Sequence, residues 1–166
     1  MRATMKYLAV LIAFLALSPH SYSQTVGKVL KGITSVQVRV NDLNKRASAC
    51  PITRNRIFES VAFTIASSQL SLSNTSSVVL DVEVIVIGIA DRESGYVTCF
   101  ADYMARVLTQ QVVHLDATNL NRQVTIELWS RSRLLWAPRD KFRARVREEN
   151  QRTTNAFIAD WTLDQQ

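Results

Sequence analysis

Apolar and polar residues alternate in four segments of the chain, with the two-residue period of half-buried β-strands. The clearest segment is 78–89 (VVLDVEVIVIGI), which is rich in β-branched residues. A short segment at 35–40 precedes it, and a long one at 96–115 follows it. The last covers 122–130, and 134–136 either continues it or forms a short separate strand. The pattern predicts four main strands, the last three joined as two hairpins.

Two other segments repeat their apolar residues every three or four positions, which is the pattern of an amphipathic helix. The first segment, 52–70, begins after Pro51, and the second, 139–161, begins after Pro138. The predicted buried side of the first helix consists of Ile57, Phe58, Val61, Ala62 and Ile65. The predicted buried side of the second helix consists of Phe142, Val146, Thr153, Phe157 and Trp161.

The predicted elements follow one another in the order β-α-β-β-β-α. A right-handed crossover makes the first two strands parallel, and the two hairpins then extend the sheet with antiparallel strands. We therefore expect an α+β protein, built as a two-layer sandwich with a mixed sheet and with both helices on one face.

The amino-terminal residues have the pattern of a secretory signal peptide. Arg2 and Lys6 precede an unbroken apolar run at 7–17, which is well short of the roughly 20 residues that a membrane-spanning helix needs. Pro19 follows, and small residues occupy the −3 and −1 positions of a cut after residue 23. We predict a signal peptide at 1–23. A permanent membrane anchor is the alternative, and the shortness of the apolar run disfavours it.

Removal of this segment leaves one domain at 24–166, a size that can form its own core. It contains 18 basic and 14 acidic residues, a net charge of +4. This mild excess does not indicate nucleic-acid binding. We expect an exported protein without a stable transmembrane anchor, located in the periplasm; the extracellular medium is the alternative location.

Cys50 and Cys99 are the only cysteines, and in an exported protein two cysteines favour a disulfide bond. The predicted topology places both at one end of the sheet. If 92–95 forms a four-residue loop, Gly88 lies opposite Cys99 on the face beneath the helices. Two reduced cysteines are the alternative, while a redox-active pair lacks the C-x-x-C motif.

Few residues suit catalysis or metal binding. His114 is the one histidine after residue 23, whereas a metal site needs several ligands. Asp81 and Glu83 share one face of a predicted strand, and the same hairpin register places Arg106 opposite Asp81. A paired-carboxylate hydrolase site is conceivable, but cross-strand charge pairing is the simpler interpretation. We expect no enzymatic activity, catalytic residue, metal or cofactor.

Basic residues recur every four positions at the start of the second predicted helix, at Arg139, Arg143 and Arg147. Such a stripe is a candidate for binding phosphate, acidic lipid or the acidic patch of a partner. The alternative interpretation is an ordinary solvated helix face.

One face of the predicted sheet carries more apolar side chains than a monomer usually exposes. This candidate interaction face consists of Ile85, Ile87, Ile89, Phe100, Met104 and Trp129. Either a partner protein or a second copy of the chain covers it, or the amino-terminal segment or 134–136 does so.

The element order between residues 35 and 161 resembles that of accessory domains of the bacterial envelope, namely the lipopolysaccharide-assembly lipoprotein and the amino-terminal domain of the Tol translocation protein. The chain lacks the lipoprotein cysteine of the first. The resemblance implies docking to other envelope proteins. We therefore expect a non-enzymatic periplasmic interaction or accessory module of the cell envelope. The alternative is a small-ligand or lipid-binding protein that uses the apolar sheet face.

Overall fold

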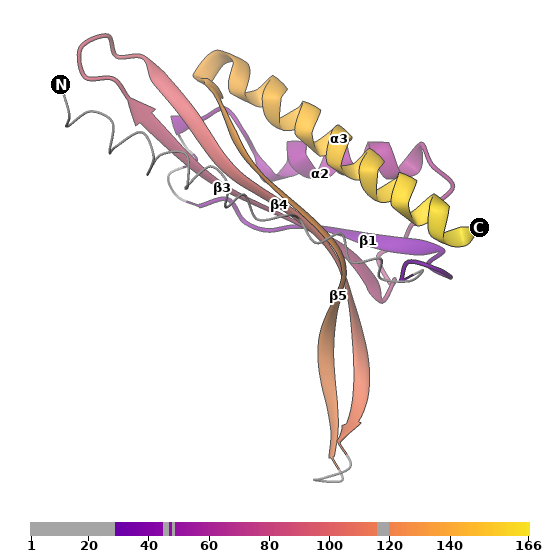
Figure 1. The fold of residues 1–166 in the computed structure, drawn as a ribbon. Coiled ribbons are helices and arrows are strands. Elements are labelled where there is room, and N and C mark those ends of the chain that lie inside the picture. The colour runs from indigo at the N-terminus through magenta and orange to yellow at the C-terminus, as the bar shows by residue number, and fades with distance from the viewer. Residues whose placement is uncertain (1–28, 45–46, 48, 116–119) are drawn as a thin grey trace, which may run out of the picture.

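The computed structural model describes residues 29–44, 47, 49–115 and 120–166 (Figure 1). The predicted signal peptide at 1–23 lies outside the described residues. Within the described part of the chain, no helix combines the length and the apolar character needed to cross a membrane.

A mixed sheet forms one layer of the molecule, with strand order β2-β1-β3-β4-β5. The strands are β1 (Ser35–Val40), β2 (Ser71–Leu72), β3 (Val78–Ala90), β4 (Val97–Leu115) and β5 (Leu120–Pro138). β1 runs parallel to β2 and β3, while β3, β4 and β5 pair antiparallel. The α+β class, the element order and the parallel pairing of the first two predicted strands are thus confirmed.

Two helices form the second layer, α2 (Arg54–Ala66) and α3 (Arg139–Gln165). Figure 1 shows both on the same side of the sheet. We call this side of the sheet the covered face and the opposite side the open face. The covered-face residues in the middle of β3 are buried, namely Leu80, Val82, Val84 and Val86. Burial of such apolar side chains is the main stabilising term of the fold.

The predicted buried side of α3 is confirmed, because Phe142, Val146, Thr153, Phe157 and Trp161 are all buried. In α2 the prediction is wrong for Phe58, whose side chain is exposed, although Ile57, Val61 and Ile65 are buried. These three residues recur every four positions and fill the strip that faces the sheet. Phe58 lies about 100° further round the helix, so it points away from that strip.

β5 is one continuous strand from Leu120 to Pro138, and α3 follows it without a loop. Its pairing with β4 changes register at one point, where Val107 lies opposite Trp129 and Leu108 lies opposite Glu127. Leu128 is therefore the extra residue of a β-bulge. Beyond the bulge, the far part of the β4–β5 hairpin projects from the body of the molecule (Figure 1).

The turn between β3 and β4 has the predicted four-residue loop, since the Asp91 amide donates to the Tyr96 carbonyl at 2.8 Å. The carboxylate of Asp91 accepts hydrogen bonds from the Glu93 and Ser94 amides and from the Ser94 hydroxyl. These bonds, those from Ser94 first, hold the pKa of Asp91 below its ordinary value. Gly95 completes the loop with a φ of +66°, which favours glycine. The loop fixes the register of the hairpin.

Candidate functional site

The open face carries a group of apolar side chains across three strands. The hairpin registers place Ile87 opposite Phe100 and Phe100 opposite Trp136. In the neighbouring row, Asp102 of β4 lies between Ile85 of β3 and Leu134 of β5. We call the apolar group the open-face patch, and it consists of Ile85, Ile87, Ile89, Phe100, Met104, Leu134 and Trp136.

Exposure separates the patch from its neighbours in the same strands. Val84 of β3 is 3 % exposed, whereas the adjacent Ile85 is 45 % exposed and Trp136 of β5 is 65 % exposed. β3 is therefore apolar on both faces at this end, although the helices cover only one of them. Strands with that pattern are usually buried on both sides.

The structure corrects two expectations about this face. Trp129 lies on the covered face, because it pairs with the buried Val107. Its indole ring packs against the ring of Phe157, with 5.5 Å between the ring centroids. Its Nε1 donates a hydrogen bond to the carboxylate of Asp160 in α3 at 2.9 Å. Residues 134–136 do not cover the patch as an overlying segment. They belong to β5, and Leu134 and Trp136 enlarge the patch instead.

The other end of the open face carries charge rather than apolar side chains. Asp81 is 1 % exposed, and its two carboxylate oxygens accept from Arg39 Nε at 2.7 Å and Arg106 Nη2 at 2.9 Å. Arg106 also reaches Glu83 at 3.4 Å. The predicted cross-strand charge pairing is confirmed. Both oxygens of Asp81 are engaged by guanidinium groups, so this carboxylate is poorly placed to act as a base or nucleophile.

His114 lies on the exposed hairpin, where its Nδ1 is 2.9 Å from the Asn121 side-chain oxygen. The hairpin register places Asn121 directly opposite His114. Among the described residues, no group of three or more His, Cys, Asp or Glu side chains is arranged to hold a metal ion.

The predicted disulfide joins Cys50 and Cys99, with a Cα–Cα distance of 6.0 Å. Gly88 lies opposite Cys99, as the hairpin register predicts. A Cβ atom at Gly88 would lie 2.7 Å from the Ala49 Cβ and 3.4 Å from the Cys50 sulfur. Glycine is therefore needed here so that the segment before α2 can approach the sheet closely enough to form the bond.

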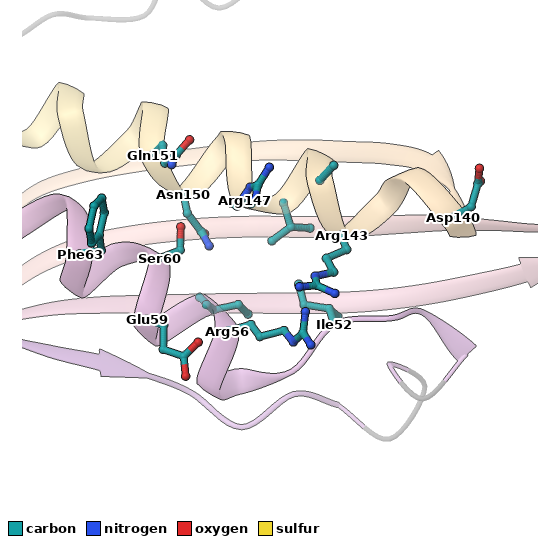
Figure 2. Close-up of a pocket in the computed structure, with 13 residues that line it drawn as sticks. Ile52, Arg56, Glu59, Ser60, Phe63, Asp140, Arg143, Arg147, Asn150 and Gln151 are labelled. Carbon is teal, nitrogen blue, oxygen red and sulfur yellow. The ribbon is translucent and has the colours of Figure 1, made fainter.

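The predicted basic stripe of α3 divides between two environments. Arg143 and Arg147 line a groove between α2 and α3, whereas Arg139 is exposed and does not line it. We call this cavity of about 530 Å³ the inter-helix groove. Its polar and aromatic lining includes Arg56, Ser60 and Phe63 of α2 and Arg143, Arg147 and Asn150 of α3 (Figure 2).

Sequence reasoning missed Leu134 and Trp136 as surface residues and Arg56 as a groove residue. The alternation of 134–137 contained the signal for the first two, because Leu135 and Ala137 are buried while Leu134 and Trp136 are exposed. No local signal marks Arg56, since its role depends on how α2 packs against α3.

No protein-family model matches the chain, and no curated protein matches it at a significant level. The open-face patch and the inter-helix groove are therefore interpreted from their own geometry.

Proposed function

We propose that this protein is a non-enzymatic interaction module, exported to the periplasm, that docks a protein of the cell envelope through the open-face patch. The observation that carries the proposal is the row formed by Ile87, Phe100 and Trp136. These three side chains lie in register across three strands, on the face that neither α2 nor α3 covers. Contiguous exposed apolar surface of this kind marks interaction sites.

The composition of the patch suits a protein partner. Aromatic residues and methionine are enriched in protein interfaces, and tryptophan is among the residues that contribute most to binding. The patch is spread over a sheet surface, whereas the larger cavities, such as the inter-helix groove, are lined by other residues. We therefore prefer protein docking to the binding of a small ligand or lipid on this face.

Charge along the β5 edge disfavours edge-to-edge pairing with a second copy of this chain. β5 forms one edge of the sheet, and its Arg131 and Arg133 lie on the covered face, opposite Ala105 and Tyr103 of β4. Antiparallel pairing of two β5 edges would bring four arginines together, and like charges oppose association. A different protein that docks on the apolar patch avoids this repulsion.

The Cys50–Cys99 disulfide supports the exported location, because such bonds persist in oxidising compartments. Amino-terminal sequencing of the protein recovered from a periplasmic fraction tests this part of the proposal. A mature chain that begins at Gln24 is the expected result. A protein that stays in the cytoplasm with residues 1–23 attached would contradict it.

Photocrosslinking in the source cell tests the docking surface. A photoreactive amino acid at Ile87 or Trp136 is expected to give one defined heterologous product, identified by mass spectrometry. The same amino acid at Leu163 is the control, because Leu163 is an exposed apolar residue of α3. Trp136→Ala is then expected to weaken binding of the purified partner by about thirtyfold, and Leu163→Ala is expected to leave it unchanged.

Three results would overturn the proposal. Products of twice the mass of the chain would identify a second copy as the occupant. Crosslinks to lipid would identify a membrane or lipid ligand. Equal yields at Ile87 and at Leu163 would remove the patch as a docking surface.

A further inference from the structure

The inter-helix groove brings basic side chains from two helices together. Figure 2 shows Arg56 of α2 and Arg143 of α3 pointing toward one another, and Arg147 lies one turn further along α3. Glu59 and Asp140 also line the groove, but their carboxylates point away from the two guanidinium groups in this view. The groove is therefore basic where the two arginines converge.

Within the described part of the chain, the three groove arginines are not ion-paired, unlike several other arginines of the fold. Arg39, Arg106 and Arg152, for example, each have a carboxylate oxygen within 3 Å. Among the described residues, no carboxylate lies within ion-pair distance of Arg56, Arg143 or Arg147. All three arginines are exposed to solvent, which screens their mutual repulsion, and an anion between two converging guanidinium groups is attracted by both. The groove thus has the charge of an anion site whose counter-ion does not come from the described residues.

Two polar side-chain atoms next to the arginines lack hydrogen-bond partners among the described residues. Asn150 is 1 % exposed, and Figure 2 shows it pointing from α3 toward Ser60 of α2. Among the described residues, neither Asn150 Oδ1 nor Ser60 Oγ has a hydrogen-bond partner. Buried polar atoms without partners are uncommon, and each one costs stability. A group that can both donate and accept hydrogen bonds would satisfy this pair.

Apolar side chains also line the groove. Ile52, Ile57 and Val146 contribute to its walls, and Phe63 is 71 % exposed at the end opposite the converging arginines in Figure 2. A ligand that fills the groove therefore meets positive charge at one end, unpaired polar atoms in the middle and an aromatic ring at the other end. Cavities of this size accommodate small ligands or short chain segments.

We propose that the inter-helix groove binds a short acidic peptide segment of a partner protein. A carboxylate side chain pairs with Arg56 and Arg143, since guanidinium groups bind carboxylates through two parallel hydrogen bonds. A backbone N–H next to it donates to Asn150, and an apolar side chain packs against Phe63. The head group of an acidic lipid offers the charge, but its alkyl chain offers no donor for Asn150. The groove lies on the helix layer, so this inference does not depend on the open-face patch.

Fluorescence anisotropy with short labelled peptides tests the proposal on the purified mature protein. The probes are acetylated peptides in which Asp or Glu flanks a leucine or phenylalanine, and the same peptides with lysine at the acidic positions. We expect binding of the acidic set only. Arg143→Gln and Arg56→Gln are each expected to weaken that binding by about tenfold.

Arg139→Gln is the matched control, because it removes the same charge from the same helix outside the groove. It is expected to leave the affinity unchanged. Arg143→Lys keeps the charge but loses the planar guanidinium, so an intermediate affinity is expected. Circular dichroism of each variant checks that the fold is retained, since these side chains are not part of the core.

The overturning results are distinct. An equal loss in Arg139→Gln and Arg143→Gln means that net charge alone attracts the peptides. Binding of phosphatidylcholine vesicles that contain phosphatidylglycerol, lost in Arg143→Gln while the acidic peptides do not bind, assigns the groove to acidic lipid. Absence of binding to either probe removes the site, and it leaves the docking test of the open-face patch unaffected.

Discussion

At the end of the sheet that carries the open-face patch, both faces are rich in apolar side chains. The helices bury these side chains on one face, and on the other face they are exposed. On the covered face, Val84 and Val86 of β3 pack beneath the helices, and Tyr103 of β4 is also buried there. On the open face, Ile85 and Ile87 of the same strand are exposed. The described residues supply a helix layer for one face only. The comparison indicates that burial on the covered face contributes more to the stability of the domain than the exposed side chains of the open face do.

The largest expected effect comes from placing the same charge on each face. Val84→Asp buries an unpaired carboxylate and is expected to lower the free energy of unfolding by about 4 kcal/mol or more. Ile85→Asp places it in solvent one residue later, directly opposite Asp102, and is expected to cost about 2 kcal/mol or less, through the poor β-propensity of aspartate and the repulsion of like charges. Urea unfolding of the two variants measures the difference. Similar losses in both would mean that the open face is not free.

Breaking the disulfide is expected to have the next largest effect. It ties the segment before α2 to β4 on the covered face and closes a loop with a sequence separation of 49 residues. Replacing both cysteines by alanine is expected to lower the free energy of unfolding by about 4 kcal/mol in the chain-entropy description. Urea unfolding measures this effect.

Gly88→Ala is expected to slow formation of the disulfide bond, because the added Cβ would collide with the Cβ of Ala49. Thiol labelling during oxidative refolding measures the rate. Unhindered oxidation of this variant would contradict the close approach.

A smaller effect is expected at the charged end of the open face. Asp81→Asn leaves Arg39 and Arg106 without a full counter-charge and is expected to cost about 2 kcal/mol, because both guanidinium groups retain access to water. Glu83→Gln is the matched control, since Glu83 is more exposed and makes one longer contact. It is expected to change the unfolding free energy by about 0.5 kcal/mol or less. Chemical denaturation distinguishes the two, and equal costs would show that burial of Asp81 adds nothing.

The smallest effect is expected on the covered face and has the opposite sign. Burial raises the pKa of Tyr103, and the negative charge of Glu149 raises it further. The Tyr103 hydroxyl has no hydrogen-bond partner among the described residues. Tyr103→Phe removes this unsatisfied group and is expected to raise the free energy of unfolding by about 1 kcal/mol.

The pH dependence of this variant gives a second readout. In the unfolded chain the phenol ionises near pH 10, but in the folded protein it remains neutral to a higher pH. Ionisation of Tyr103 therefore leaves the free energy of unfolding unchanged below about pH 10 and lowers it as the pH rises above that value. Tyr103→Phe is expected to lose less stability than the parent protein between neutral and alkaline pH. Parallel curves for the two proteins would contradict the buried neutral phenol.

Local periodicity was sufficient to predict the elements, because the alternation of β3 and the four-residue spacing of α3 are recorded in adjacent residues. The hairpin register and the position of Cys99 opposite Gly88 followed from one loop length. Trp129 was misplaced because its face depends on how β5 pairs with β4, which lies outside any local window. The short strand β2 was missed for a similar reason, since two residues carry no period. Arg56 became a site residue only through the packing of two helices.

The junction at Pro138 limits which changes of chain length the protein tolerates. β5 ends at Pro138 and α3 begins at the next residue. The rotation of α3 about its own axis is therefore fixed relative to β5, and so are the relative positions of Trp136 and Arg143. A single inserted residue at this junction would turn the whole of α3 by about 100° relative to the sheet. That turn would carry Arg143 and Arg147 out of the groove and expose Phe142 and Val146. Among related chains, substitutions near this junction should therefore be far more common than insertions or deletions.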